Sequence, residues 1–324
     1  GDIEAGGAFA DTVAFGGWTM DDHHPAGLLY PDAPTIHHPA PSPYGIPYRC
    51  LYSRNIGNLL FAGRNISVTH AALSSTRVMA TCALLGQAAG TAAALCSRHA
   101  SSPRELGRSR LGELQQTLLD DDCFLPGIRR EPDGLAREAR LAGGGERLAA
   151  LRDGVERDRE NEPHHWLAAP GEAAEYHWDG TREIGGARLV LDSNLNNDKR
   201  MPCHYPVRGR STAVPESLLR AFRIEARDSA GNWSTVYRAD DNRRRLLALP
   251  LEVQADALRL IPESSWGHER FRVFGFEPTA LPSRKIPEIP EAPSFAEVRA
   301  AQNPDDLAAP AKPDGPKELP GHTA

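Results

Sequence analysis

The sequence predicts an α+β fold, in which a helical first part precedes an antiparallel β-sandwich and a disordered tail. Apolar residues recur at three- and four-residue spacing over residues 103–119, which is typical of a helix. After residue 165 the apolar residues alternate with polar ones, which is typical of strands. From residue 278 the chain is mainly Pro, Ala and charge, which favours disorder. We therefore expect a first domain over 1–130, a linker over 131–164, a sandwich over 165–277 and a tail over 278–324.

Composition excludes several classes of protein. The formal net charge of the 324 residues is -6, which gives no reason to expect nucleic acid or an anionic membrane as a partner. The cysteine count is odd and no two cysteines have C-x-x-C spacing, which argues against a zinc site or a disulfide scaffold. The five cysteines are Cys50, Cys82, Cys96, Cys123 and Cys203.

The first domain is predicted to contain loops, one strand and two helices. Residues 1–57 are rich in Gly, Pro and His and lack periodicity, as in loops that cover another surface. The apolar run 58–63 predicts a buried strand that ends at a glycine. Ser74 and Ser75 are candidate N-caps for a helix that runs to about Cys96. A second helix is expected over 103–119, with Pro103 in its first turn.

Residues 78–96 allow two interpretations. The segment carries no charge and is long enough to span a membrane. However, alanine predominates, Gln87 and two threonines interrupt the segment, and no aromatic belt flanks it. We expect a buried helix packed on a sheet, with a membrane span as the alternative.

The sandwich is predicted from short runs with strand character separated by turn residues. One turn is clear, because "DSAGNW" at residues 228–233 joins two alternating runs. The expected strands are "GARLVLDSNL", "AFRIEARD", "WSTVYRAD", "RRRLLALPL", "DALRLIP" and "RFRVFGFE".

Residues 58–90, "NLLFAGRNISVTHAALSSTRVMATCALLGQAAG", carry a resemblance to a known family. They resemble the C-terminal, flavin-contacting segment of the FAD-dependent oxidoreductases that share the glutathione-reductase-like Rossmann fold, and the resemblance extends over about residues 10–130. It implies that Gly63 and Arg64 lie beside the ribityl and pyrophosphate groups of FAD, and that residues 75–78 present backbone N–H groups to the flavin. The implied cofactor-binding residues are Gly63, Arg64, Ser67, Ser75, Thr76 and Val78.

The chain departs from this family in one respect. Such enzymes begin with a strand, a G-x-G-x-x-G turn and a helix, and this motif occurs nowhere in the sequence. We therefore interpret the first domain as part of a Rossmann-type FAD-binding domain, from a truncated gene product or a split enzyme. An N-terminal FAD-binding half, which holds the adenosine end, is the expected partner.

Two residues of the matching segment are candidates for catalysis. In related fumarate-reductase-like enzymes a His and an Arg of this segment hold or protonate the substrate, and these would be His70 and Arg77 here. Histidine suits this role because its ordinary pKa lies near neutrality. The alternative is a histidine at a helix start and an arginine bound to a backbone carbonyl.

Asp21, Asp22, His23, His24, His37 and His38 suggest a metal site by residue type only. Neighbouring histidines on a Pro-rich loop lack the i, i+4 spacing of H-E-x-x-H, so we expect no metal. One of these side chains can instead point into a substrate pocket, and solvated or structural roles are the further alternative. Tyr44, Tyr48 and Arg49 offer either shielding of a flavin pocket or ordinary packing.

The second domain resembles a galactose-binding-like, discoidin-type jelly roll in "NWSTVYRADDNRRRLLALPL" and "DALRLIPESSWGHERFRVFGFE". Such domains often bind sugars, which makes Trp233, Trp266 and Asn242 candidate contacts for a carbohydrate. They are also common as purely structural modules, and we favour that role here.

Taken together, the residues predict a subunit or C-terminal portion of an FAD-dependent oxidoreductase that removes hydride from an alcohol or a sugar-like substrate. The chain would be an enzyme only when an N-terminal half completes it. The alternative is a non-enzymatic carbohydrate-binding or structural protein whose flavin domain has decayed.

Overall fold

The computed structural model describes residues 1–159, 162–196 and 214–280. These residues all belong to one compact unit. Most of the predicted tail and Cys203 lie outside the described residues. The described part contains the α-helices and two short antiparallel sheets in its first 138 residues and a larger antiparallel sheet from residue 140 onward, so the α+β prediction is confirmed.

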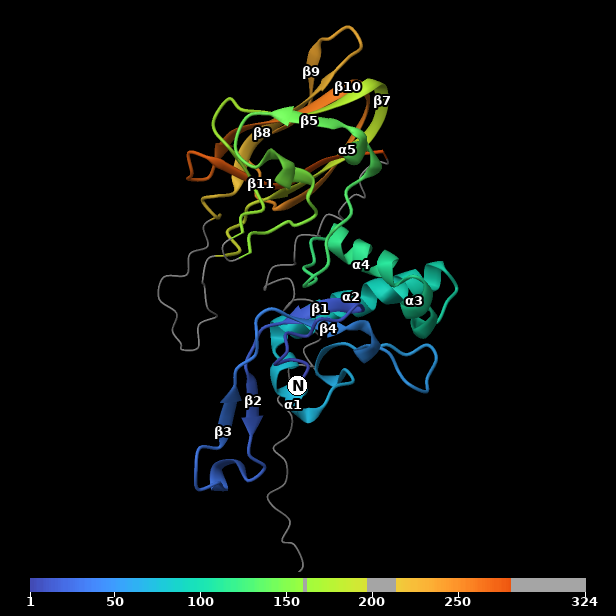
Figure 1. Ribbon diagram of the computed structural model, residues 1–324, viewed down its shortest axis with the longest axis vertical. Helices are drawn as coiled ribbons and strands as arrows, with labels where there is room; N and C mark the ends of the chain where they lie inside the picture. The colour runs from blue at the N-terminus through green and yellow to red at the C-terminus, as the bar shows by residue number, and fades with distance from the viewer. Residues whose placement is uncertain (160–161, 197–213, 281–324) are drawn as a thin grey trace, which may run out of the picture. The chain divides into compact units, whose positions relative to one another are not determined.

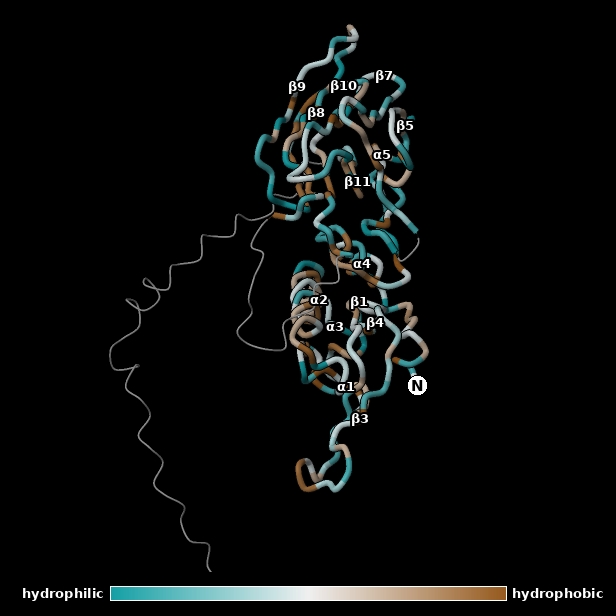
Figure 2. Tube along the Cα trace, turned by 90° about the vertical axis from the view of Figure 1, so that its left-hand side faces the viewer, coloured by the Kyte–Doolittle hydropathy of each residue, from teal (hydrophilic) through white to brown (hydrophobic). Residues whose placement is uncertain are grey.

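Two small antiparallel sheets form the start of the chain (Figure 1). In one, β1 (Thr12–Gly16) pairs with β4 (Tyr44–Pro47). In the other, β2 (Met20–His23) pairs with β3 (Thr35–His38) in a hairpin whose tip contains the 3-10 turn η1 (Gly27–Leu29). The tip is apolar and fully in solvent, because Leu28 and Leu29 are 97% and 89% exposed (Figure 2).

Four helices cover a core built from the first part of the chain. They are α1 (His70–Thr76), α2 (Met79–Arg98), α3 (Pro103–Ser109) and α4 (Leu111–Asp120), with the 3-10 turns η2 (Tyr48–Cys50) and η3 (Gly63–Asn65) before them. The predicted single helix over 103–119 is therefore wrong in one respect, because the chain leaves helical geometry at Arg110. Its start is confirmed: Ser102 and Glu105 form a capping box and Pro103 takes the first helical position.

The predicted strand over residues 58–63 is wrong. Only one isolated bridge forms, between Tyr52 and Leu60, and Leu60 is half-buried. A buried strand of a parallel sheet needs neighbours on both sides, and the described residues provide none beyond that bridge.

Helix α2 is the longest helix of the described residues, and one side of it is in the core. Leu85, Ala88, Ala92 and Leu95 are buried, whereas Met79 is 76% exposed. By length and composition, α2 could also cross a membrane, a test that core helices of soluble proteins pass as well. The expectation that this helix packs in a protein core is therefore supported along one side only.

The predicted β-sandwich is confirmed by seven paired antiparallel strands among the described residues. The order β6-β11-β7-β10-β8-β9 is continuous, β5 pairs with β7, and β7 and β10 are long, irregular strands. The "DSAGNW" turn joins β8 to β9 as expected. The strands are β5 (Arg140–Gly143), β6 (Trp166–Ala168), β7 (Ala174–Leu191), β8 (Leu219–Arg227), β9 (Trp233–Ala239), β10 (Leu246–Ser265) and β11 (Phe271–Thr279).

The segment expected to be a linker, residues 131–164, contributes to this sandwich. It contains α5 (Gly134–Glu138), β5 and the 3-10 turn η4 (Leu148–Arg152), and it places Ala136 and Leu151 in the sandwich core. Trp178 donates a hydrogen bond from Nε1 to the carbonyl oxygen of Leu135 at 3.0 Å. Polar and glycine residues between these few core positions hide the pattern in the sequence.

Charged side chains surround the end of α4. Arg188 donates to the carbonyl oxygens of Leu119 and Asp120, at 3.2 and 3.1 Å, where a helix leaves carbonyls without partners. Arg130 and Glu277 are both buried and form an ion pair, with 2.5 Å between Nη2 and Oε2.

Candidate functional site

The segment expected to contact a cofactor forms two helices with a break between them. Thr69 caps α1, because its Oγ1 accepts a hydrogen bond from the Ala72 N–H at 3.3 Å. The prediction that Ser74 and Ser75 begin one long helix is wrong, since both residues lie inside α1. Their hydroxyls are engaged elsewhere: Ser74 donates to the Ala71 carbonyl, and Ser75 bonds to the Trp18 carbonyl.

Helix α2 then begins at Met79 without a side-chain cap. Val78 precedes it in an extended conformation, with φ -70° and ψ 147°. The first N–H groups of a helix lack partners inside the helix, so those of the first turn of α2 are available to a ligand. The Arg77 N–H instead donates to the Leu73 carbonyl at 3.1 Å. The free N–H groups therefore belong to α2 rather than to residues 75–77.

Gly63 lies beside this helix start. Its φ of +84° is a backbone conformation that residues other than glycine rarely adopt. A Cβ placed on Gly63 would lie 4.0 Å from Cys82, in the first turn of α2. Arg64 follows in the 3-10 turn η3 and is exposed. The structure thus brings Gly63, Arg64 and Val78 to the same helix end.

Ser67 and Thr76 line a separate pocket of about 390 Å³ between β4, α1 and the N-terminal residues. Thr76 is 3% exposed, and its Oγ1 has no hydrogen-bond partner. Ser75 lies behind the pocket, where its Oγ also meets the Tyr44 hydroxyl. Burial raises the pKa of Tyr44, which keeps that hydroxyl protonated.

The two candidate catalytic residues lie at opposite ends of α1. His70 is its first residue and is exposed, and its imidazole forms no hydrogen bond with the described residues. Arg77 follows its last residue and donates from Nη2 to Nε2 of His23 at 3.1 Å. His23 in turn contacts Thr35 Oγ1 through Nδ1 at 2.9 Å. The sequence analysis missed this link, because it joins residues 54 positions apart.

Among the acidic and histidine residues of the β2–β3 hairpin, Asp21 and His37 pair with each other, whereas His23 contacts Thr35 and Arg77. Asp21 accepts from Trp18 Nε1 at 2.8 Å, from Thr19 Oγ1 at 2.7 Å and from His37 at 2.7 Å. Burial alone would raise the pKa of Asp21, but these three hydrogen bonds lower it to about 2. Asp21 is therefore an ionised structural group. Within the described ranges, no group of His, Cys, Asp and Glu side chains is arranged to hold a metal ion.

The carbohydrate candidates of the sandwich contact their own chain. Asn242 is buried and donates from Nδ2 to the carbonyl oxygens of Leu219 and Arg244. Trp266 donates from Nε1 to the Asn242 carbonyl at 2.8 Å. The Trp233 ring lies under the Arg259 guanidinium, 4.1 Å from its centroid. These contacts are those of structural residues.

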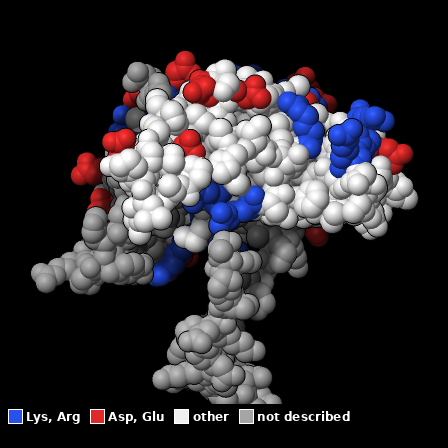
Figure 3. Space-filling view, turned by 90° about the horizontal axis from the view of Figure 1, so that it is seen from below, with Lys and Arg blue, Asp and Glu red and all other residues white. Residues whose placement is uncertain are grey.

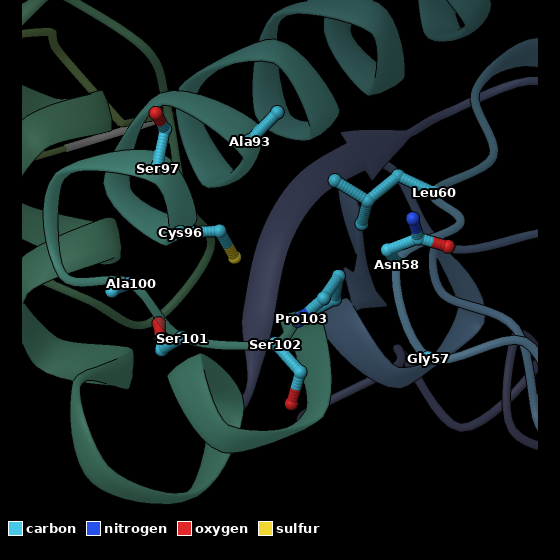
Figure 4. Close-up of a pocket in the computed structure, with 10 residues that line it drawn as sticks. All are labelled: Gly57, Asn58, Leu60, Ala93, Cys96, Ser97, Ala100, Ser101, Ser102 and Pro103. Atoms are coloured by element: carbon cyan, nitrogen blue, oxygen red, sulfur yellow. The ribbon is translucent and has the colours of Figure 1, made fainter.

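A larger pocket, of about 580 Å³, contains none of the predicted site residues (Figure 4). Leu60 and the Cys96 thiol face each other across it. It lies where the end of α2 and the start of α3 meet residues 57–60. Burial raises the pKa of Cys96, so this thiol stays protonated and is not a nucleophile.

Comparison with known proteins agrees with the sequence for the first part of the chain. Residues 1–118 match the family model described as FAD dependent oxidoreductase, so the resemblance is confirmed for those residues. No curated protein matches the chain.

Several solved structures are similar to part of the chain. The family 32 carbohydrate-binding module from Streptococcus pneumoniae EndoD is 14% identical, with 44% of this chain and 97% of that chain covered and a TM-score of 0.34. Chitosan-binding module 2 of a chitosanase/glucanase from Paenibacillus sp. IK-5, in complex with chitotriose, is 14% identical, with 45% and 99% covered and a TM-score of 0.33. The family 32 module from C. perfringens NanJ, in complex with galactose, is 9% identical, with 44% and 95% covered and a TM-score of 0.32.

Proposed function

We propose that this chain supplies the flavin-contacting part of an FAD-dependent oxidoreductase, and that an N-terminal FAD-binding half completes the enzyme. The observation that carries the proposal is the uncapped start of α2 at Val78, with Gly63 beside it. Free N–H groups and the helix dipole favour negative charge at that point. The family match over residues 1–118 supports the same assignment.

The residues present fit the flavin end of FAD. Gly63 leaves open space, since only Cys82 comes within 4 Å of an added Cβ. Arg64 is an exposed cation that can pair with a phosphate group. Val78 precedes the first turn of α2 in an extended conformation, whereas Ser67 and Thr76 line the separate pocket of about 390 Å³. Ser75 contributes by fixing α1 to Trp18.

The reaction removes a hydride from the C–H carbon of an alcohol or sugar-like substrate. When bound, FAD supplies the two-electron acceptor. The substrate hydroxyl also loses its proton, so the product is a carbonyl compound. We assign that proton to His70, which is exposed and has no partner of its own, and we assign the substrate oxygen to Arg77. Figure 3 shows one face of the molecule, on which Lys and Arg side chains lie among wide uncharged areas.

The exposed side of α2 is the surface proposed for the N-terminal half. An added Cβ at Gly86 or Gly90 meets nothing within 4 Å, so this side is bare in the described structure. Figure 2 shows apolar to neutral colouring along the helix. The pocket of Figure 4 continues this surface at Ala93 and Ser97. A partner that packs here would also cover Leu60 and give the 58–63 segment a neighbouring strand.

The proposal is tested by the visible absorbance of bound flavin. We expect the chain alone to be colourless after incubation with excess FAD and desalting. Co-expression with the polypeptide encoded directly upstream, if it carries G-x-G-x-x-G, should give stoichiometric flavin. Gly63→Val should abolish retention, because valine disfavours φ near +84°. The matched control Gly134→Val changes a glycine without positive φ, with open space around it and outside both pockets. Stoichiometric flavin on the chain alone would show that the second half is unnecessary.

A further inference from the structure

The β2–β3 hairpin projects from the helical part of the chain and has an apolar tip. In Figures 1 and 2 it extends away from the helices, and within the described residues β2 and β3 pair only with each other. Leu28 and Leu29 at the tip are 97% and 89% exposed, and Ile36 on β3 is 54% exposed. An isolated two-stranded hairpin is only marginally stable in water. Exposed apolar side chains that lie together are typical of an interaction site.

The base of the hairpin is fixed to α1 and to the turn that follows it. Ser75 Oγ donates to the Trp18 carbonyl at 2.6 Å. Arg77 Nη2 donates to His23 Nε2 at 3.1 Å. Arg77 lies directly before Val78 and the start of α2, where we place the flavin. A polypeptide that closes over the flavin at this helix start therefore lies next to the hairpin.

The tip has a defined conformation although it is in solvent. The His24 and Tyr30 rings stack, with 3.7 Å between their centroids. The Ala26 N–H donates to His24 Nδ1 at 3.2 Å. These contacts hold the turn that carries Leu28 and Leu29, and both leucines stay exposed. A turn that is already formed loses less conformational entropy on binding than a mobile loop, so the tip is suited to bind a partner.

The charge near the tip distinguishes between possible partners. Residues 1–48 contain six Asp and Glu residues and no Lys or Arg. Asp22 and Asp32 flank the tip, are exposed, and have no ion-pair partner within the described ranges. An anionic membrane repels these carboxylates, and a contact between the tips of two copies brings like charges together. A partner with an apolar socket surrounded by Lys or Arg matches both the leucines and the carboxylates.

We propose that the β2–β3 hairpin is a docking arm for the N-terminal FAD-binding half, and that Leu28 and Leu29 enter an apolar socket on that half with Lys or Arg around it. The inference rests on the proposed function and adds a second contact to the surface assigned on α2. Because Arg77 joins the hairpin to the start of α2, docking of the tip also fixes the guanidinium that we assign to the substrate oxygen.

The test titrates the purified chain and its variants into the N-terminal half that is used in the flavin retention test. Leu28→Ser together with Leu29→Ser removes the apolar tip, so the dissociation constant should rise about 10²-fold. The matched control Leu195→Ser changes an exposed leucine outside the hairpin and should leave the dissociation constant unchanged. Asp22→Asn together with Asp32→Asn should lower the association rate at low salt and weaken its salt dependence.

Measurements on the chain alone test the other possible occupants of the tip. Self-association that the double-serine variant abolishes would assign the tip to a second copy of the chain. Binding to phosphatidylcholine vesicles that this variant abolishes would assign the tip to a membrane. A lower thermal stability of the variant would show that the tip packs on its own chain. Each of these three results overturns the proposal.

The docking arm and the proposed function can fail separately, because titration measures association and absorbance measures flavin. Association without bound flavin contradicts the proposed function but not the arm. Stoichiometric flavin, together with an unchanged dissociation constant for the double-serine variant, contradicts the arm but not the proposed function.

Discussion

Arg77 donates a hydrogen bond from Nη2 to Nε2 of His23 at 3.1 Å. A guanidinium has no acceptor atom, so His23 Nε2 must accept, and the imidazole proton lies on Nδ1, facing Thr35 Oγ1 at 2.9 Å. The turn between α1 and α2 is thereby tied to the β2–β3 hairpin. This contact orients Arg77 at the start of α2, where we place the flavin.

Removing Arg77 should affect reduction of the flavin more than its retention. In the enzyme completed by its N-terminal half, Arg77→Ala and His70→Ala should each slow flavin reduction by substrate about 10²-fold or more, as for residues that position or exchange protons with a substrate. Bound FAD should stay near stoichiometric. Stopped-flow absorbance of the flavin measures the rate, and loss of FAD with an unchanged rate would reassign both residues to the cofactor.

His23 should act through Arg77. His23→Ala leaves the guanidinium without its partner, so the substrate KM should rise while bound flavin is unchanged. His38→Ala is the control, because His38 lies on the same hairpin, is exposed and is paired with Met20 in register. In the chain alone, long-range ¹H–¹⁵N correlation NMR should show that the His23 imidazole carries its proton on Nδ1. The Arg77→Ala variant should lose this tautomer preference. A proton on Nε2 in the unmodified chain would contradict the hydrogen bond.

A bulky residue on the bare side of α2 should block assembly without unfolding the chain. Gly90→Leu meets open space, and its higher helix propensity adds up to about 1 kcal/mol to the free energy of unfolding. The same substitution should prevent co-purification with the N-terminal half. Gly112→Leu is the matched control, since Gly112 is a helical glycine of α4 that also has open space around it. Normal co-purification of the Gly90→Leu variant would place the partner elsewhere.

The Glu277 carboxyl should make stability fall as pH rises. Burial raises its pKa to about 7, although Arg130 opposes the shift. The folded state therefore binds a proton more tightly than the unfolded state, and this stabilisation, present below about pH 4.5, is lost as pH rises through about 7. Between pH 5 and 8, chemical denaturation should show that the free energy of unfolding decreases by up to about 3 kcal/mol. The Glu277→Gln variant should lack this decrease.

A carboxylate on the outer face of the sheet provides the contrast. Hydrogen bonds from Arg223 and Arg259 outweigh burial and lower the pKa of Glu225. Its stabilising contribution is therefore lost as pH falls, which is the opposite sign. In a Glu225→Gln variant, the free energy of unfolding should still decrease between pH 5 and 8. If it also decreases in the Glu277→Gln variant, Glu277 is not the source of the decrease.

The folded sandwich should need residues before 165. A fragment over 131–280 retains α5, β5 and the core side chains Ala136 and Leu151. A fragment over 165–277 leaves their places empty, so its free energy of unfolding should be lower by at least about 3 kcal/mol. Thermal unfolding followed by circular dichroism measures both. Equal stability would support the linker that the sequence predicts.

The sequence by itself determined the parts of this protein whose signals are local. Period-two runs located β8, β9 and β11, and Ser102, Pro103 and Glu105 marked the start of α3. The segment 58–90 identified the flavin-related part, which the match over residues 1–118 confirms.

Only the tertiary structure decided the features that depend on distant residues. The local pattern predicted one helix from Ser74 or Ser75 to about Cys96, whereas α1 begins after its cap Thr69 and Val78 takes an extended conformation between α1 and α2. The 58–63 run is apolar enough for a strand but has no sheet to join in the described structure. The pocket at Thr76 and the Arg77–His23 contact bring together segments separated by long stretches of chain, and no local periodicity encodes such contacts.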